Sequence, residues 1–194
     1  MLTHLQGAAK QTRATGAANL LGTLTPFAIP TRNVFTIVHT LNGTYADMEI
    51  ANNGQIGLID PRPPAVKNYF FVSLEGITFL TSGAVNAIPL NMTNWSPNAG
   101  FGSVAPAWTK AEGIVHLLGA AKQTTGGGSN PNLLGTLPLA ARPMRNVFTI
   151  VHTFFRTYDD IAIQTNGQIG LIDPRPPART DYRFVSLEGI SYQQ

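Results

Sequence analysis

The chain has 194 residues and a formal net charge of +3, with 43% hydrophobic and only 12% charged residues. This length allows one large domain or two of about 100 residues, and the hydrophobic fraction is sufficient for a buried core. The chain has no cysteine, and its basic residues are scattered without a run that could follow a phosphate backbone. We therefore expect no nucleic-acid partner, no disulfide framework and no thiolate metal site.

The N-terminal residues Met1–Gly7 lack the basic and apolar regions of a signal peptide. No apolar run of the sequence approaches the ~18 residues that a membrane-spanning helix needs. The sequence therefore predicts a protein without a signal peptide and without membrane insertion.

Most of the sequence occurs twice. Leu20–Phe79 aligns with Leu133–Tyr192 at a constant offset of 113, and 41 of the 60 aligned positions are identical. Upstream, His4–Gln11 aligns with His116–Gln123 at an offset of 112, so the two aligned blocks are separated by one more residue in the second copy. The sequence therefore predicts an internal duplication that produces two copies of one module.

Each copy reads as short strands between turns. In the first copy, Asn33–Thr40 is rich in β-branched and aromatic residues and predicts a strand, which Asn146–Thr153 repeats letter for letter. Tyr45–Ala51 and Gln55–Asp60 predict the two arms of a hairpin. The Asn53-Gly54 pair between them predicts a type I′ turn, in which both central residues have positive φ.

The end of each copy contains a proline-rich segment and a further strand. The prolines of Asp60–Pro64 and Asp173–Pro177 remove ladder donors, so these segments predict stiff extended loops. Phe71–Ile77 and its copy Phe184–Ile190 predict a final strand that closes each module. No segment shows helical periodicity of useful length. The pattern predicts an all-β fold of two tandem antiparallel β-sandwich or small-barrel modules.

The second copy has a leader, Asn94–Lys110, that the first copy lacks. The resulting division is a first β module at 1–80 without its leader strand, a linker at 81–93 and a second β module at 94–194. An edge strand without a neighbour exposes unpaired N–H and C=O groups that invite pairing. We therefore predict that a strand from another subunit or from another part of the chain pairs with Leu2–Leu5. Leu80–Asn94 is the candidate segment within the chain.

The four histidines form two repeat pairs, His4 with His116 and His39 with His152. None has a second ligand at metal-ligand spacing, so we predict no metal site and interpret the histidines as strand residues bonded to backbone or hydroxyl groups. The glycine-rich segment Thr124–Ser129 lacks the lysine and following hydroxyl residue of a phosphate-binding loop. We expect no cofactor.

Two acidic pairs occur in both copies, Asp60 with Asp173 and Glu75 with Glu188. Two carboxylates in each module are compatible with glycosidase chemistry. Asp before proline and Glu before glycine are also common turn residues, which is the interpretation that we prefer. We therefore predict no catalytic residue and no enzyme activity, with a hydrolase as one alternative.

Four residues are candidate contacts with a partner. Arg62 and Arg175 each stand in a proline frame that would hold them rigidly. Trp95 and Trp108 belong to the leader, and large aromatic residues near amides can form platforms for sugars.

The motifs of the second copy stand in a recognisable order: Trp108-Thr109-Lys110, Gly113–Gly119, Leu137-Pro138, Arg142-Pro143, Ile161–Ile169 and Phe184–Tyr192. This order resembles the β-rich modules near the C-termini of tailed-bacteriophage minor tail, tail-fibre and head-fibre proteins. The first copy departs from the pattern at Leu24-Thr25-Pro26 and Ile29-Pro30, where the Leu-Pro and Arg-Pro elements are missing.

The resemblance implies a bacteriophage virion structural protein, a surface fibre, spike or decoration protein of tail or capsid, assembled in the host cytoplasm. The partners it implies are other virion proteins and further copies of the chain, with a homotrimer favoured and a host cell-surface glycan as candidate ligand. It assigns no catalytic residue. The alternative is a non-viral carbohydrate-binding, lectin-like module, which would show a matched exposed cluster of aromatic and amide residues in both copies.

Overall fold

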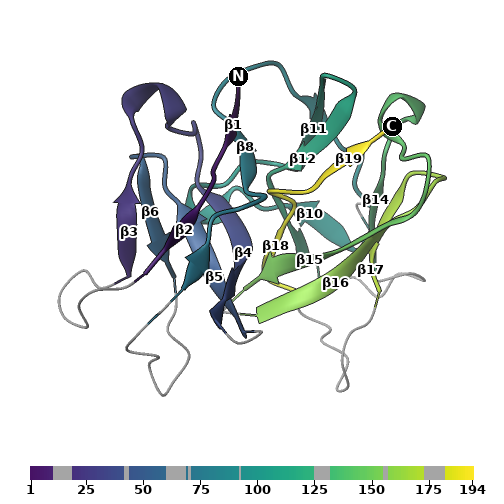
Figure 1. Cartoon of the computed structure of the whole chain (residues 1–194). Coiled ribbons are helices and arrows are strands. Elements are labelled where there is room, and N and C mark those ends of the chain that lie inside the picture. Colours follow the sequence, from purple (N-terminus) through teal and green to yellow (C-terminus); the bar gives the residue numbers. More distant parts are fainter. Residues whose placement is uncertain are drawn as a thin grey trace. The chain divides into compact units, whose positions relative to one another are not determined.

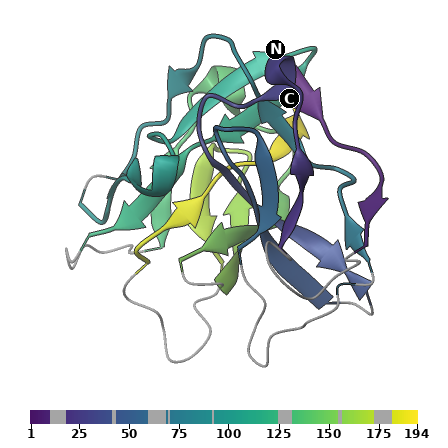
Figure 2. The same cartoon turned by 90° about the vertical axis from the view of Figure 1, so that its left-hand side faces the viewer.

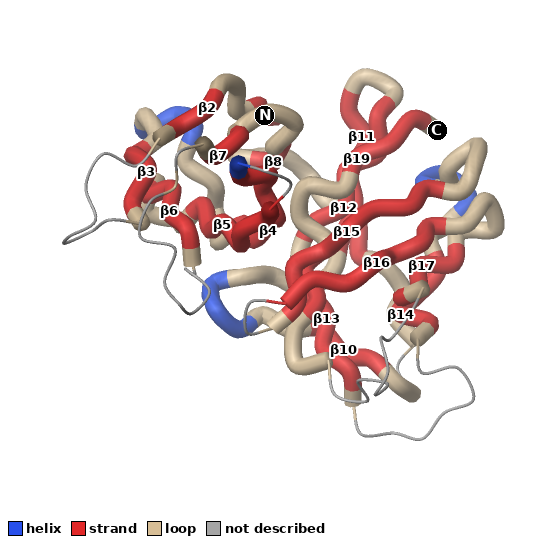
Figure 3. Tube along the Cα trace, turned by 60° about the horizontal axis from the view of Figure 1, so that its bottom comes forward, coloured by secondary structure: helices blue, strands red, loops and turns tan. Residues whose placement is uncertain are grey.

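The computed structural model describes residues 1–10, 19–41, 44–59, 69, 71–91, 93–124, 132–154, 157–172 and 182–194. Strands and short 3₁₀ turns are the only regular elements of these described residues, which contain no α-helix. The chain divides into two compact units, Met1–Gly83 (unit 1) and Ala84–Gln194 (unit 2). The prediction of an all-β chain with two tandem antiparallel modules is confirmed (Figures 1 and 3).

Unit 1 contains the strands Leu2–His4 (β1), Ala8–Ala9 (β2), Leu20–Thr23 (β3), Val34–Thr40 (β4), Thr44–Ile50 (β5), Gln55–Leu58 (β6), Val72–Ser73 (β7) and Thr78–Leu80 (β8), and a 3₁₀ turn at Pro26–Ala28 (η1). Its main antiparallel sheet has the order β2-β7-β4-β5-β6-β3, and β1 pairs with β8 in a second sheet. Figure 2 shows the strands of unit 1, coloured from purple to blue, from a second side. The inward residues of β4, β5 and β6 form the core, because successive side chains of a strand point to opposite faces.

Unit 2 contains the strands Asn86–Ala87 (β9), Trp95–Pro97 (β10), Ala107–Ala111 (β11), Ile114–Leu118 (β12), Ala120–Gln123 (β13), Leu133–Thr136 (β14), Val147–Thr153 (β15), Thr157–Ile163 (β16), Gln168–Leu171 (β17), Val185–Ser186 (β18) and Ser191–Gln193 (β19), with 3₁₀ turns at Gly100–Gly102 (η3) and Leu139–Ala141 (η4). Its main sheet has the order β10-β13-β18-β15-β16-β17-β14. A second sheet has the order β19-β12-β11-β9 (Figure 1).

The two units share one strand pairing and one register. Val34 pairs with Ile50 in unit 1, and Val147 pairs with Ile163 in unit 2, which is the same pair at the offset of the repeat. The irregularity in the edge strand also recurs, between Leu20 and Gly22 in β3 and at the equivalent place in β14. The repeated residues therefore specify the same framework twice.

The hairpin predicted at Asn53-Gly54 is present, but its turn is not type I′. Gly54 N donates to Ala51 O at 2.8 Å, and Gly54 has a φ of +89° whereas Asn53 does not have a positive φ. These features describe a turn followed by a glycine bulge, in which only the glycine needs the left-handed conformation. A two-residue turn with both φ values positive joins β11 to β12 instead, at Glu112 and Gly113.

The final strand predicted at Phe71–Ile77, and at Phe184–Ile190, is interrupted in both units. Each of these segments begins with a two-residue strand, β7 or β18, which ends before a Glu-Gly turn. Gly76 has a φ of +78°, a conformation that glycine adopts without steric cost. After this turn the chain leaves the main sheet and pairs with β1 in unit 1 as β8, or with β12 in unit 2 as β19.

Residues 84–93 belong to unit 2 and are not a linker. β9 pairs with β11, and the side chain of Ile88 is buried in the core of unit 2. The boundary therefore lies between Gly83 and Ala84. Of the candidate segment Leu80–Asn94, Leu80 pairs with Leu2 and Thr81 N donates to Met1 O at 2.9 Å, whereas its described residues after Gly83 belong to unit 2.

The segment Ala84–Ala111, here called the extended leader, closes the main sheet of unit 2. Its residues Pro89–Asn91 bond to β14 at one end of the sheet, with Asn91 N donating to Leu134 O at 2.9 Å. A few residues later β10 pairs with β13 at the other end. Because the extended leader bonds to both β13 and β14, it bridges the two ends of a sheet that is nearly closed into a small barrel.

Within the described residues, no helix has both the length and the apolar content needed to span a bilayer.

Candidate functional site

A shallow groove lies on the outer face of the main sheet of unit 2. One row of paired residues crosses the groove, from Phe148 on β15 through Ala162 on β16 and Gly170 on β17 to Leu133 on β14. The floor is low because Ala162 and Gly170 are small, whereas the Phe148 side chain beside it is 65% exposed. The groove encloses a volume of about 370 Å³.

Amide side chains supply the polar part of the groove. Its lining residues are Asn132, Leu133, Asn146, Phe148, Ala162, Gln164, Gln168, Gly170, Leu171 and Ile172. Asn146 Oδ1 accepts a hydrogen bond from Thr165 N at 3.1 Å, and Asn146 Nδ2 has no partner among the described residues. Amides offer both donors and acceptors, and an exposed phenyl ring offers an apolar face. Together they can bind a neutral ligand that has hydroxyl groups around an apolar face, as a sugar ring has.

In unit 1, a larger side chain occupies the position that corresponds to the groove floor. The corresponding row contains Phe35, Glu49, Gly57 and Leu20, so Glu49 replaces the small Ala162 of the groove floor. The Glu49 carboxylate accepts a hydrogen bond from Asn33 Nδ2 at 2.7 Å, and Phe35 is only 6% exposed. In the described part of unit 1, this row therefore does not repeat the exposed cluster of the groove.

The candidate contact residues fall into three groups. Arg62 and Arg175 lie outside the described residues. Trp95 is fully buried and stacks on Tyr182 with ring centroids 6.1 Å apart, so it is a core residue and not a surface contact. Trp108 lies half-buried on β11, packed against the core of unit 2, and its indole Nε1 has no hydrogen-bond partner within the described part of the chain.

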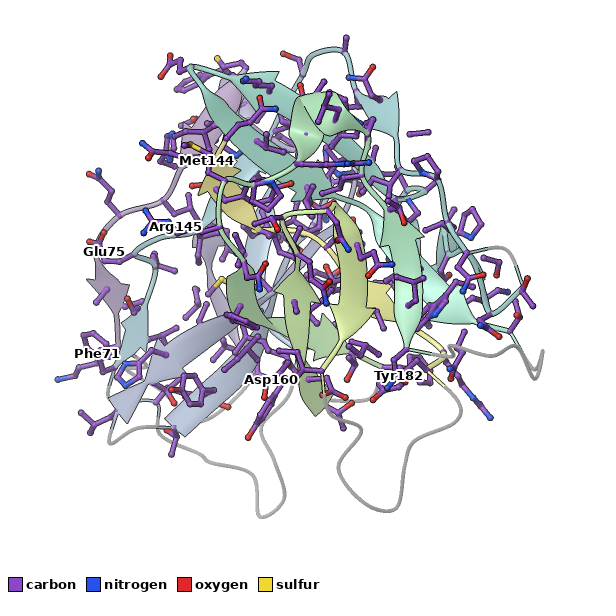
Figure 4. The ribbon with its side chains drawn as sticks, turned by 90° about the vertical axis from the view of Figure 1, so that its right-hand side faces the viewer. Phe71, Glu75, Met144, Arg145, Asp160 and Tyr182 are labelled. Carbon is purple, nitrogen blue, oxygen red and sulfur yellow. The ribbon has the colours of Figure 1, made fainter. Side chains whose placement is uncertain are left out.

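Tyr182 contacts both Trp95 and Asp159 in unit 2. Its hydroxyl donates a hydrogen bond to Asp159 Oδ2 while its ring stacks on Trp95. Figure 4 shows Tyr182 and the neighbouring Asp160 at the same end of the unit. Unit 1 has Ala46 in place of Asp159, so this hydrogen bond is specific to unit 2.

The retained glutamates Glu75 and Glu188 each accept a hydrogen bond from a backbone N–H. Glu188 Oε1 accepts a hydrogen bond from Gly119 N at 2.7 Å, and Glu75 Oε1 accepts one from Gly7 N at the same distance. Glu188 is buried, whereas Glu75 is exposed at the edge of unit 1 (Figure 4). Both contacts agree with the turn interpretation, while Asp60 and Asp173 lie outside the described residues.

Two of the histidines bond to hydroxyl groups on the neighbouring strand. His4 Nδ1 lies 2.9 Å from Thr78 Oγ1, and His116 Nδ1 lies 2.8 Å from Ser191 Oγ. Among the described residues, no group of three or more His, Asp or Glu side chains is arranged to hold a metal ion.

No family model, no curated protein and no solved structure matches this chain. The likeness to tailed-bacteriophage modules therefore rests on the sequence motifs alone, and it stays a prediction. The geometry by itself shows a shallow groove lined by amides and Phe148 on unit 2.

Sequence reasoning missed this groove because its two sides come from strands that the repeat makes look equivalent. The signal in the sequence was that the second copy has Ala162 and Gln164 where the first copy has Glu49 and Ala51, within otherwise similar strands. Only the strand pairing shows that both exchanges lie beside Phe148 on one face.

Proposed function

We propose that this protein is a structural component on the surface of a bacteriophage particle, a fibre, spike or decoration protein of the tail or the capsid. The order of motifs in the second copy carries the proposal. A duplicated β-rich framework supports it, because repeated modules provide extended binding and assembly surfaces. The retained glutamates serve as turn contacts, which is consistent with a binding role.

Labelling of intact particles tests the location. Antibody raised against the purified chain should decorate the tail or the head of the phage that encodes it, in negatively stained preparations. Antibody against a known internal protein of the same particle is the control for broken particles. Absence of labelling on intact particles would overturn the proposal.

The proposed assembly state is a homotrimer. Light scattering coupled to size exclusion should give three times the mass of one chain. A mass of one chain at micromolar concentration would contradict the trimer and would favour a monomeric decoration protein.

A second candidate function is recognition of a cell-surface glycan through the groove of unit 2. The observation that favours it is the exposed ring of Phe148 beside the amides of Asn146 and Gln164. Ala162→Glu would introduce the residue that fills the same position in unit 1, and it should abolish binding to glycans displayed on an array. Glu49→Ala, made in unit 1, is the matched control and should leave glycan binding unchanged. Equal binding by the Ala162→Glu variant would exclude the groove.

A further inference from the structure

We infer that unit 1 is a receptor for an extended segment of a partner polypeptide, which binds in the place that the extended leader occupies in unit 2. This inference does not rest on the proposed function, because it follows from comparing the edges of the two units. Its partner is defined by chemistry: an uncharged, proline-containing strand with one aromatic residue that enters the barrel.

In unit 2 the extended leader satisfies the backbone of three strands. β11 pairs with the outer edge of β12 along five residue pairs. Ala120 N at the start of β13 donates to Val104 O at 2.9 Å, and Thr136 N at the end of β14 donates to Pro89 O at 3.0 Å. The extended leader thus covers the gap between β13 and β14, which we call the seam; the corresponding strands of unit 1 are β2 and β3.

Unit 1 presents the same edges without this cover. β1 corresponds to β12 and pairs only with β8 among the described residues. Ala8 and Thr23 correspond to Ala120 and Thr136, and nothing in the described part of unit 1 bonds to their N–H groups on the seam side. Backbone groups in this arrangement are a template for an added strand.

Two glycines show that the seam of unit 1 has room for a strand. A Cβ atom at Gly119 would lie 2.3 Å from Ala105 O, and one at Gly135 would lie 2.5 Å from Pro89 O, so both glycines of unit 2 permit close approach of the extended leader. Their counterparts Gly7 and Gly22 would meet nothing within 4 Å. Unit 1 therefore has the glycines that a bound strand needs, and the space beside them is open.

Burial of the side chains changes in the same places. Leu134 and Leu117 of unit 2 are buried in the same core cluster as Ile88 and Trp95 of the extended leader. Their counterparts Leu21 and Leu5 are only partly buried. A strand bound over the seam of unit 1 would remove this apolar surface from water, which stabilises the complex.

The extended leader defines the chemistry of the occupant. Lys110, next to the last residue of the extended leader, is its one charged residue, and the segment includes three prolines, with Trp95 entering the core. An uncharged strand matches a seam lined by alanine, glycine and leucine. The leader of a second copy is not a sufficient occupant, because each chain has two units but only one leader. If a leader moved from unit 2 of one copy to unit 1 of another, it would leave the edges of its own unit 2 uncovered.

The test uses a fluorescent synthetic peptide of residues 84–111 added to the full chain. Unit 2 already carries its own leader, so the peptide should bind saturably to unit 1, and hydrogen exchange should slow in β1, β2 and β3. Gly22→Ala should weaken binding by at least roughly tenfold, a change of about 1.4 kcal/mol, without changing the unfolding midpoint. A peptide with Trp95→Ala should also bind more weakly.

Three outcomes would overturn the inference. The first is absence of saturable binding, and the second is binding that Gly22→Ala leaves unchanged. The third is self-association of the chain through β1, seen as a doubled mass that the peptide reverses by competition, which would make a second copy the occupant. None of these outcomes bears on the labelling of intact particles, so the two proposals can fail separately.

Discussion

Units 1 and 2 have the same strand order and register, yet they differ in what covers their edges. The extended leader closes the main sheet of unit 2 and adds β9 and β11 to its second sheet. In unit 1 the equivalent second sheet consists only of β1 and β8 among the described residues. The comparison teaches that the repeated residues specify the framework, whereas a segment outside the repeat decides whether the framework is complete.

The largest expected effect comes from removing the aromatic core residue of the extended leader. Trp95→Ala should destabilise unit 2 by about 3–5 kcal/mol, because it leaves a cavity under the closing segment. Hydrogen exchange resolved by mass spectrometry in low urea should show faster exchange in β13 and β14 and no change in β4 and β5. Equal loss of protection in both units would mean that the two units unfold together, and it would contradict the expectation that the effect is confined to unit 2.

A matched pair of glycine substitutions isolates the closing contact. Gly135→Ala places a Cβ atom 2.5 Å from Pro89 O, and overpacking of this kind should cost about 1–3 kcal/mol. Gly22→Ala meets nothing within 4 Å and should change stability by less than about 0.5 kcal/mol. Urea unfolding of both variants measures the difference. If the two variants are equally unstable, the close approach at Gly135 does not hold the seam closed.

The paired glutamates should differ because one is buried. Glu188→Ala leaves the N–H of Gly119 without its acceptor in a buried place, which should cost about 1–3 kcal/mol. Glu75→Ala releases Gly7 N where water can replace the carboxylate, so its effect should be within about 0.5 kcal/mol. Thermal unfolding of the two variants compares them directly, and a larger loss for Glu75→Ala would refute the comparison.

The smallest effect depends on pH. Burial raises the pKa of Tyr192 above the ordinary value of 10.0, and its hydroxyl donates to Ala141 O at 2.7 Å. Because the raised pKa belongs to the folded state, the stability it contributes is complete below pH 10 and declines as the pH rises above that value. Tyr192→Phe should therefore cost about 1 kcal/mol at neutral pH, and this deficit should shrink in alkaline solution. Unfolding midpoints across the alkaline range measure the trend, and a constant deficit would contradict it.

The fold class and the hairpins were predictable from the sequence because they depend on local patterns. The Val34–Thr40 strand follows from β-branched enrichment, and the arms around Asn53-Gly54 follow from alternation and a turn signal. The turn type was predicted wrongly because the Asn-Gly pair is compatible with both a type I′ turn and a glycine bulge. The placement of Trp95 was also not predictable, because a tryptophan in a polar segment is as compatible with a surface contact as with a core position.

By itself the sequence determined that one all-β framework occurs twice, because identical residues at a constant offset form identical strands and pairs. Only the tertiary structure decided which framework is bridged by the extended leader. Closure depends on long-range contacts, such as Thr136 N with Pro89 O and Trp95 with Tyr182, between segments that carry no local signal for one another. The same contacts explain why Gly135 lies under a strand while Gly22, its repeat counterpart, faces open space.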